Sequence, residues 1–240
     1  MSSFIQYNDV ILDGFVSNSK RNDIINKKRD LLDSILGHYQ IQATNILFVG
    51  FSPWCLGLSD QPFAITEVSD KVLEFLDKQG CNYTHYDLTA LSNKKYSIVI
   101  ASDEYFTFAS TDIEQRSLVD TLSKLTSGII VTTLRDYKNQ DFKDREFSQP
   151  IMVKGQDTGK IFLEHYEYDI KDKNSSVSKT FVINEQSSEM FGPFARRNMY
   201  FKQLAKFSMD AGASSFFVHK ILMYKSIIKK NYEHIITIKF

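Results

Sequence analysis

Cysteine and proline are scarce in this sequence, and neither residue forms a pattern. Of 240 residues only two are cysteine, Cys55 and Cys81, and four are proline. Two isolated cysteines exclude a disulfide framework and do not suffice for a zinc site. The chain also lacks a Pro/Gly-rich linker, an internal repeat and a low-complexity tract. We therefore expect a single domain in a reducing compartment.

An excess of one charge and a long apolar run are absent as well. Lysine plus arginine number 29, as do aspartate plus glutamate, so the formal net charge is zero. Without a net positive field, general nucleic-acid binding is not supported. No window approaches about eighteen apolar residues, and residues 1–14 lack the basic start and apolar core of a signal peptide. These absences predict a cytoplasmic protein with no membrane span.

The motifs of several enzyme classes are missing. There is no Gly-x-Ser-x-Gly sequence, no Walker loop and no His-Glu-x-x-His sequence, so hydrolase and NTPase activities have no support. The five histidines are scattered without the spacing of metal ligands. Only His219, in a predicted closing strand, is a candidate for a functional role, and we expect no bound metal.

What the chain does contain, up to residue 134, is an alternation of apolar strands and amphipathic helices. Short apolar runs typical of buried strands alternate with segments of helical spacing. Ser69 and Thr111 are suited to cap two of the helices. The predicted order is helix 23–36, strand 45–50, turn 51–57, strand 63–67, helix 69–80, strand 81–87, strand 96–101, helix 111–125 and strand 128–134. Such alternation predicts parallel strands with right-handed crossovers.

The pattern changes after residue 134. Residues 135–155 are polar and irregular, and strands over 161–170 and 177–183 form a predicted β-hairpin. A helix over 200–211 and two closing strands, 215–224 and 232–239, complete the chain. The closing strands are joined so closely that they must be antiparallel. The fold class is therefore α/β, a doubly wound, mostly parallel Rossmann-like sheet with antiparallel C-terminal strands, an N-terminal helical arm and a β-hairpin insertion.

The last forty residues and the stretch 96–134 carry a family likeness. A helix ending in Ala211-Gly212 leads into the last two strands, and 96–134 forms strand, helix, strand. This arrangement resembles class I S-adenosylmethionine-dependent methyltransferases, and the resemblance covers Asn45 to the C-terminus. It implies S-adenosylmethionine as the cofactor. It divides a single domain, 1–240, into a helical arm (1–40), a cofactor-binding half (41–134), an insertion and substrate segment (135–197) and a closing helix and strands (198–240).

Polar residues at the carboxyl ends of the predicted strands are the candidate cofactor site, because ligands bind there in open parallel sheets. By resemblance, Gly50 allows the backbone to approach the ligand, Glu67 accepts the ribose hydroxyls and Asp87 binds the adenine amino group. Gly50 is also suited to a simple turn, and Asp87 to an N-cap. The cofactor-binding candidates are Gly50, Phe51, Ser52, Glu67, Val68, Asp87, Leu88 and Ser102.

The loop after the first strand departs from the family's acidic-x-Gly-x-Gly-x-Gly pattern. Phe48 stands at the acidic position, and only Gly50 remains of the glycines. Ser52 and Trp54 occupy the later glycine positions. A tryptophan there changes how closely the backbone can approach a ligand, so this fingerprint alone is weak.

The segment after the fourth strand supplies the candidate catalytic residues, Asp103, Glu104 and Tyr105. A carboxylate there can orient an acceptor or take its proton, and alignment matters most in an in-line methyl transfer. Alternatively, Asp103 or Glu104 caps the following turn. Basic residues of the irregular segments are candidates for binding a phosphate or carboxylate of the substrate, or are simply solvated. They are Arg135, Lys138, Lys143, Arg145, Arg196 and Arg197.

Three functions follow from these residues. The first is a methyltransferase acting on an unidentified acceptor that is most simply a small molecule, and homo-oligomerisation stays open. The second is an S-adenosylmethionine lyase or other nucleotide-using enzyme on the same fold. The third is a non-catalytic binding protein, which Trp54 favours and the pair Glu67 and Asp87 opposes. We also predict that helix 23–36 and hairpin 160–183 flank the crevice mouth, the alternative being that they cover a sheet face and extend an edge.

Overall fold

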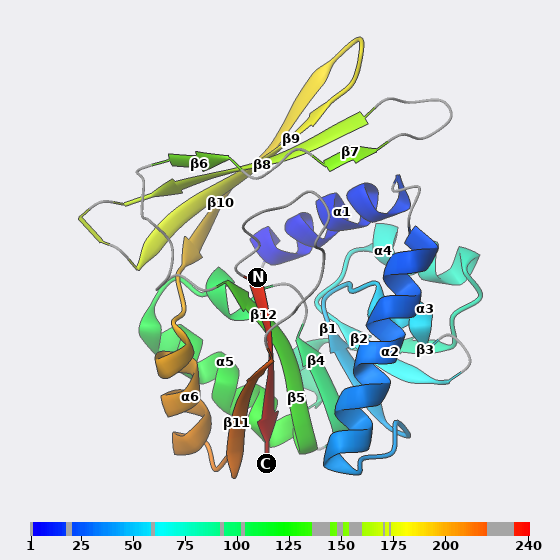
Figure 1. Ribbon diagram of the computed structural model, residues 1–240, viewed down its shortest axis with the longest axis vertical. Helices are drawn as coiled ribbons and strands as arrows, with labels where there is room; N and C mark the ends of the chain where they lie inside the picture. Colours follow the sequence, from blue (N-terminus) through cyan, green and yellow to red (C-terminus); the bar gives the residue numbers. More distant parts are fainter. Residues whose placement is uncertain are drawn as a thin grey trace.

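Two β-sheets, one above the other, organise the chain (Figure 1). The computed structural model describes residues 2–17, 21–58, 61–91, 94–101, 104–135, 145–147, 151–153, 160–169, 171–172, 174–219 and 233–240. The larger sheet forms the body with helices on both faces, and the smaller sheet lies across one end of it. Within the described residues, no helix is long and apolar enough to cross a membrane.

The larger sheet has seven strands in the order β11-β12-β5-β4-β1-β2-β3. Neighbours from β3 to β5 pair in parallel, and β12 is antiparallel to both β5 and β11. The strands are β1 (Ile46–Val49), β2 (Phe63–Thr66), β3 (Tyr83–His85), β4 (Tyr96–Ala101), β5 (Thr126–Arg135), β11 (Ser215–His219) and β12 (Glu233–Lys239). The predicted fold class is confirmed, and strand order reverses between β1 and β4.

Helices cover both faces of this sheet because its central strands are apolar on both sides. Every residue of β1 is buried, and its side chains alternate between two hydrophobic clusters. On one face pack α2 (Arg21–Tyr39), α3 (Trp54–Gly57) and α4 (Asp70–Lys78). On the other pack α5 (Asp112–Leu125), α6 (Phe201–Asp210) and the short 3₁₀ helices η1 (Leu88–Leu91) and η2 (Tyr105–Phe108).

The predicted helix caps are confirmed. The Ser69 hydroxyl accepts from the Val72 amide at the start of α4, and the Thr111 hydroxyl accepts from the Glu114 amide at the start of α5. These polar residues satisfy amides that the helices themselves leave without a partner. The local sequence therefore determined where both helices begin.

The smaller sheet is larger than the predicted hairpin. Its strands follow the order β10-β9-β8-β6, with β7 also paired to β8. They are β6 (Arg145–Phe147), β7 (Ile151–Val153), β8 (Lys160–Tyr168), β9 (Ser175–Ile183) and β10 (Ser188–Arg197). The antiparallel hairpin β8–β9 is confirmed. Strand β10 was not predicted, because it contains Gly192 and Pro193. Both residue types disfavour strand interiors, and they lie at a shift in the pairing register with β9.

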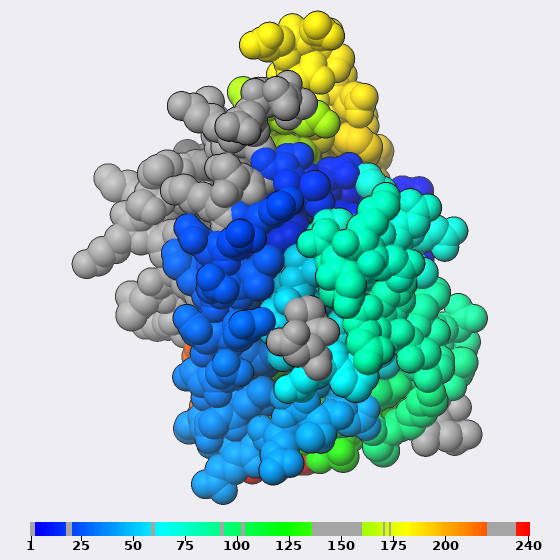
Figure 2. Space-filling view, turned by 90° about the vertical axis from the view of Figure 1, so that its right-hand side faces the viewer, coloured from blue at the N-terminus to red at the C-terminus, as the bar shows by residue number. Residues whose placement is uncertain are grey.

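A helix at the N-terminus, α1 (Ser2–Val16), was not predicted as a separate element of the helical arm. It lies between the two sheets, under the second sheet and over the body (Figures 1 and 2). Its buried side chains face the body and the second sheet, so the helix has no single apolar stripe. Phe4 packs in the core of the body, whereas Tyr7 and Val10 pack with Phe194 of β10. A helix buried on two sides is harder to recognise from periodicity.

The predicted arrangement at the crevice mouth needs one correction. The helix predicted over 23–36 belongs to α2, which covers a sheet face through Leu32, Ile35 and Leu36. Over the carboxyl ends of the parallel strands lie α1 and the second sheet instead. The hairpin part of the prediction holds, since Tyr168 of β8 contacts Arg135 at the end of β5.

Candidate functional site

The loop after β1 begins with a glycine that the backbone requires. Gly50 has φ +83°, a conformation that favours glycine, and its amide donates to the Thr66 carbonyl of β2 at 2.9 Å. The next amide, of Phe51, donates to the Asn8 side chain of α1 at 2.9 Å. Phe51 itself is fully buried. The helix α1 is thus fastened directly to this loop.

Trp54 is buried at the start of α3, directly after the loop. Its indole Nε1 has no hydrogen-bond partner in the described part of the chain. The Lys28 ammonium lies 5.5 Å from the centre of its ring. Ser52 is also buried, and together with Trp54 and Thr132 it lines a cavity of about 10 Å³. That volume suits a single water-sized atom group.

Glu67, directly after β2, has two unusual properties. Its backbone is left-handed at φ +58°, which is costly for any residue with a Cβ. Its side chain is half-buried, yet it has neither a hydrogen-bond nor a salt-bridge partner among the residues that the structure describes. Burial raises the pKa of the Glu67 carboxyl, against a smaller lowering by the N-terminal charge, and the charge of Asp87 adds to the rise. Val68, the next residue, is buried.

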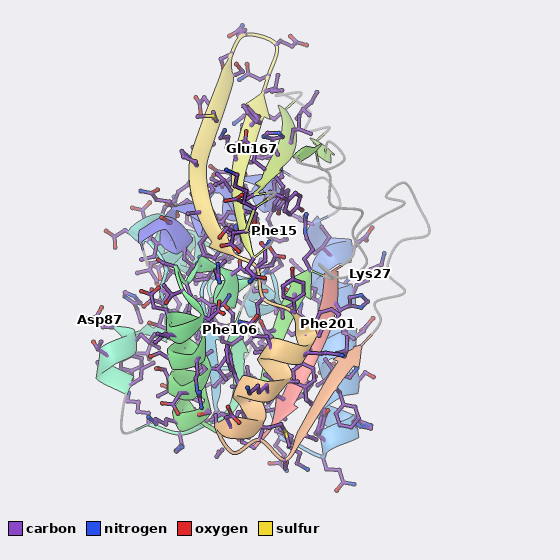
Figure 3. All side chains as sticks on the ribbon, turned by 90° about the vertical axis from the view of Figure 1, so that its left-hand side faces the viewer. Phe15, Lys27, Asp87, Phe106, Glu167 and Phe201 are labelled. Carbon is purple, nitrogen blue, oxygen red and sulfur yellow. The ribbon has the colours of Figure 1, made fainter. Side chains whose placement is uncertain are left out.

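Asp87 lies at the end of β3, at the outer edge of the main body (Figure 3). It is exposed, and its carbonyl accepts from the Ala90 amide in η1. Leu88 begins η1 and packs against the core on the α5 face. Because their charges interact, Glu67 and Asp87 form one acidic rim at the carboxyl ends of neighbouring strands.

After β4, Ser102 and Asp103 lie outside the described residues, and the description resumes at Glu104. This residue is also left-handed, at φ +58°, and only 3% exposed. Its Oε2 lies 3.3 Å from Arg196 Nη1 and its Oε1 3.9 Å from Arg135 Nε. The carboxylate does not cap η2; the Glu104 carbonyl instead accepts from the Thr107 amide and hydroxyl. The sequence did not predict that the Glu104 carboxylate lies between two arginines.

Tyr105 is fully buried beside Glu104, in the body beneath the second sheet. Its ring lies 4.9 Å from the ring of Phe4 on α1, nearly edge to face. Burial, and then the charge of Glu67, raise the pKa of its hydroxyl. In the described part of the chain that hydroxyl has no hydrogen-bond partner. The residue therefore stays a neutral phenol with an unused donor.

The basic candidates serve internal contacts where the structure describes them. Arg197 pairs with Asp112 and Asp172, each at 2.7 Å. Arg196 is buried against the rings of Tyr7 and Phe108. Of the other candidates, Lys138 and Lys143 lie outside the described residues. Arg145 begins β6, but its side chain lies outside the described part of the structure.

Three polar side chains that were not predicted as site residues lie together at this end of the body: Tyr7, Glu164 and Tyr166. The Glu164 carboxylate of β8 accepts from the Tyr7 hydroxyl of α1 at 3.1 Å and from the Tyr166 hydroxyl at 3.2 Å. The guanidinium of Arg135 lies 3.8 Å from the centre of the Tyr166 ring. Alternation along β8 places Glu164, Tyr166 and Tyr168 on one face. That signal was readable, but nothing in the sequence showed which surface the face would meet.

Comparison with solved structures decides the fold. DesVI of Streptomyces venezuelae has a TM-score of 0.70 at 13% identity, over 96% of this chain and 95% of that chain. The CcbJ methyltransferase of Streptomyces caelestis has 0.66 at 18%, over 88% and 93%. CalS10 of Micromonospora echinaspora, an amino pentose methyltransferase with bound S-adenosylmethionine, has 0.65 at 12%, over 90% and 90%.

The chain has the class I S-adenosylmethionine-dependent methyltransferase fold. The family resemblance drawn from the sequence is confirmed at the level of structure. No protein-family model matches the chain, and no curated protein does. At identities of 18% or less, the likeness establishes the fold, and the chemistry has to be argued from the site.

In open parallel sheets ligands bind at the carboxyl ends of the strands, and several buried polar atoms toward this end have no partner among the described residues. Buried polar atoms without partners are rare in native structures. Here four of them come from β2, β5 and the loops after β1 and β4: Thr66 Oγ1, Thr132 Oγ1, Trp54 Nε1 and Tyr105 OH. A polar ligand with several hydrogen-bonding groups would satisfy atoms of this kind. Within the described residues, no group of three or more His, Cys, Asp or Glu side chains is placed to hold a metal ion.

Proposed function

We propose that this protein is an S-adenosylmethionine-dependent methyltransferase that acts on a small-molecule acceptor. Glu67 carries the proposal. A half-buried carboxylate without a partner among the described residues, held in a strained backbone conformation at the carboxyl end of β2, is costly in the free protein. Ribose hydroxyls would relieve that cost by donating to it. Two proteins with this fold are named methyltransferases, CcbJ and CalS10.

The remaining cofactor candidates fit a nucleoside with an amino-acid tail. Asp87, exposed at the end of β3, would accept from the adenine amino group. Gly50 leaves the backbone free of a Cβ where the loop turns away from β1. Bound there, S-adenosylmethionine supplies a methyl group activated by its attachment to a sulfonium ion. The protein's own contribution is to bind and orient the two reactants.

The altered loop after β1 has a compensating feature. The family pattern places glycines at the positions of Ser52 and Trp54, whereas here the Phe51 amide is already bonded to Asn8. Trp54 and Ser52 line the same small cavity, and their side chains carry polar groups, an indole N–H and a hydroxyl. We propose that the Trp54 N–H, which lacks a described partner, takes part in binding the cofactor's polar tail.

On the acceptor side, the described residues divide into positioning and contacting groups. Glu104 is saturated by Arg135 and Arg196, so its role in the proposal is to hold the two arginines and the second sheet in place. The Tyr105 hydroxyl has no hydrogen-bond partner in the described part of the chain. Among the described residues, Tyr105 is therefore our candidate for contact with a bound ligand. Asp103 remains a sequence-based candidate. We find no contact among the described residues that favours a lyase or a cofactor-free binding module.

Ligand binding tests the proposal directly. The purified protein is titrated calorimetrically with S-adenosylmethionine, S-adenosylhomocysteine, ATP and NAD, and its thermal unfolding is recorded with each. We expect the first two ligands alone to bind. At one hundred times its dissociation constant a ligand stabilises the protein by about 2.7 kcal/mol. Binding of ATP or NAD with no response to the sulfonium compounds would overturn the proposal.

A further inference from the structure

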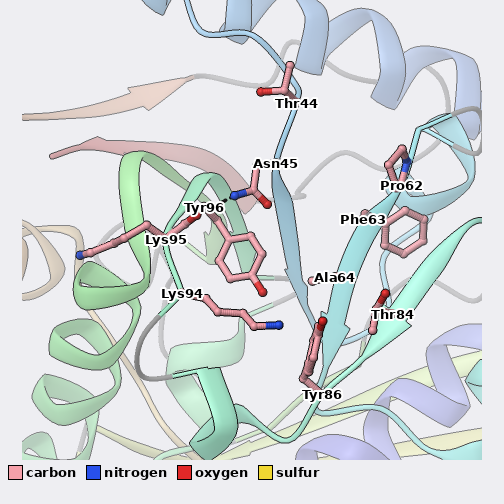
Figure 4. A pocket seen from close by; sticks show the side chains of 10 residues that line it. All are labelled: Thr44, Asn45, Pro62, Phe63, Ala64, Thr84, Tyr86, Lys94, Lys95 and Tyr96. Carbon is pink, nitrogen blue, oxygen red and sulfur yellow. Dashed lines mark hydrogen bonds between the residues drawn. The ribbon is translucent and has the colours of Figure 1, made fainter.

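A polar pocket runs along the main sheet, from the starts of β1, β2 and β4 to Tyr86, directly after β3. It has a volume of about 380 Å³ and is lined where β1, β2 and β4 begin (Figure 4). Asn45 and Pro62 immediately precede β1 and β2, and Tyr96 is the first residue of β4. Ligands of the proposed methyl-transfer reaction belong at the other ends of these strands. Most of the pocket lining is therefore remote from those ends, and Tyr86, which directly precedes Asp87, is the part nearest to them.

One lysine points into this pocket and the next one does not. The Lys94 side chain extends between the rings of Tyr86 and Tyr96 (Figure 4), with its ammonium 3.5 Å from the centre of the Tyr86 ring. Among the described residues, none that lines the pocket is acidic, and none forms a salt bridge with Lys94. Lys95 points away, and its ammonium donates to the Thr126 carbonyl at 3.4 Å. Within the described part of the chain, no carboxylate therefore balances the positive charge of Lys94.

Hydroxyl groups complete the polar lining. Tyr96 is 4% exposed, yet its hydroxyl has no hydrogen-bond partner among the described residues, and it points toward the space around Lys94 (Figure 4). The Thr84 hydroxyl lies across from it. The nearby Lys94 ammonium lowers the pKa of the Tyr86 hydroxyl. Ala64 lies at the back, where its single methyl group leaves the space open.

We propose that this pocket binds a small organic anion, a phosphate or carboxylate group carried on a flat ring. Lys94 supplies the positive charge, and the Tyr96 and Thr84 hydroxyls donate to the anionic oxygens. The Tyr96 ring contacts the flat part of the ligand, since the face of the Tyr86 ring is already covered by the Lys94 ammonium. The volume is within the range of pockets that bind small molecules. Binding here does not depend on the proposed methyl transfer.

Calorimetric titration of the full chain with phenyl phosphate, benzoate and inorganic phosphate tests this inference. Phenyl phosphate or benzoate is expected to bind, and inorganic phosphate to bind more weakly because it lacks the ring. Lys94→Met removes a charged hydrogen-bond donor and should weaken binding about tenfold or more. Lys95→Met, a change in the neighbouring lysine that points away, is the matched control and should leave the dissociation constant unchanged. Saturating S-adenosylhomocysteine should also leave it unchanged.

The opposite results are equally clear. The inference is overturned if none of the three anions binds, or if Lys94→Met and Lys95→Met weaken binding equally. Competition by S-adenosylhomocysteine would place the anion in the crevice and overturn the separate site. Inorganic phosphate binding as tightly as phenyl phosphate would overturn the part played by the aromatic rings. Both lysines are exposed, so neither variant threatens the fold.

Discussion

Glu67 and Glu104 occupy equivalent places on either side of β1, yet their surroundings differ. One follows β2 and the other follows β4, the two neighbours of β1. Both are acidic, and both have the left-handed backbone at φ +58°. Glu67 is half-buried with no described partner, whereas Glu104 is 3% exposed between Arg135 and Arg196.

The contrast supports a structural role for Glu104 and bears on the binding role that we propose for Glu67. Backbone strain at both residues shows that the fold over-determines the position of each carboxylate. At Glu104 the internal arginines already compensate the buried charge, and Arg196 belongs to β10, so the pair joins the second sheet to the body. Glu67 has no hydrogen-bond or salt-bridge partner among the described residues. Strain and burial are common to both residues, so the proposed binding role of Glu67 rests on this difference in partners.

The largest expected effect is at the Glu104 pair. Glu104→Ala leaves the Arg196 guanidinium, whose side chain is fully buried, without its counter-charge, and should lower the free energy of unfolding by about 3–5 kcal/mol. Urea denaturation measures this loss. The control is Glu74→Ala, which removes a carboxylate that is 71% exposed and should change stability by less than about 1 kcal/mol. Equal midpoints for the two variants would mean that Glu104 has no structural role.

Glu67→Ala should act on ligand binding instead. Removing the charged acceptor is expected to weaken S-adenosylmethionine binding by about 1.5–3 kcal/mol, which is tenfold or more. The melting temperature of the free protein should stay nearly unchanged, because no described residue loses a partner. Calorimetry and thermal unfolding of the same sample give both quantities. Wild-type affinity in Glu67→Ala would show that the carboxylate does not contact the cofactor.

Glycine substitution compares the two strained positions directly. Glu67→Gly relieves the left-handed conformation without breaking a described contact, and should stabilise the free protein by about 1 kcal/mol relative to Glu67→Ala. Glu104→Gly relieves the same strain but loses the arginine contacts, so it should remain less stable than wild type. Urea midpoints for the four proteins test the contrast. Destabilisation by both glycines would mean that Glu67 makes a stabilising contact in the free protein.

The smallest effect concerns pH. Burial, and then Asp87, raise the pKa of Glu67 above its ordinary value of 4.5, so the folded protein holds this proton more tightly than the unfolded chain does. The protonated carboxyl thus favours folding, and that contribution is lost as the pH rises from 4.5 through the raised pKa. Glu67→Gln, which cannot ionise, should match wild type in acid and be more stable at neutral pH. Parallel pH profiles of unfolding free energy would contradict the assignment.

The framework of the main sheet was predictable because its signals are local. The runs 46–49 and 96–101 are apolar enough to be buried on both faces, and Ser69 and Thr111 cap the helices that the spacing predicted. A strand's burial, a helix's first residue and a parallel crossover all depend on residues close together in the chain. For the same reason Glu67, at a strand end, was identified as a candidate from the sequence.

The second sheet and α1 were less predictable because their signals are not local. Strand β10 contains Gly192 and Pro193, and α1 is buried on two sides, so neither shows the usual pattern. Their stability comes from packing against elements far away in the chain, such as Tyr7 against Glu164. Propensity is a weak guide where tertiary contacts of this kind dominate.

By itself, the sequence determined the order of strands and helices and placed an acidic residue after β2 and another after β4. The tertiary structure alone decided that they have different surroundings. Arg196 lies 92 residues from Glu104 along the chain, and their meeting depends on how the second sheet lies over the body. Because the interaction of two charges depends on their distance and on burial in space, sequence position does not reveal which carboxylate is compensated and which has no described partner.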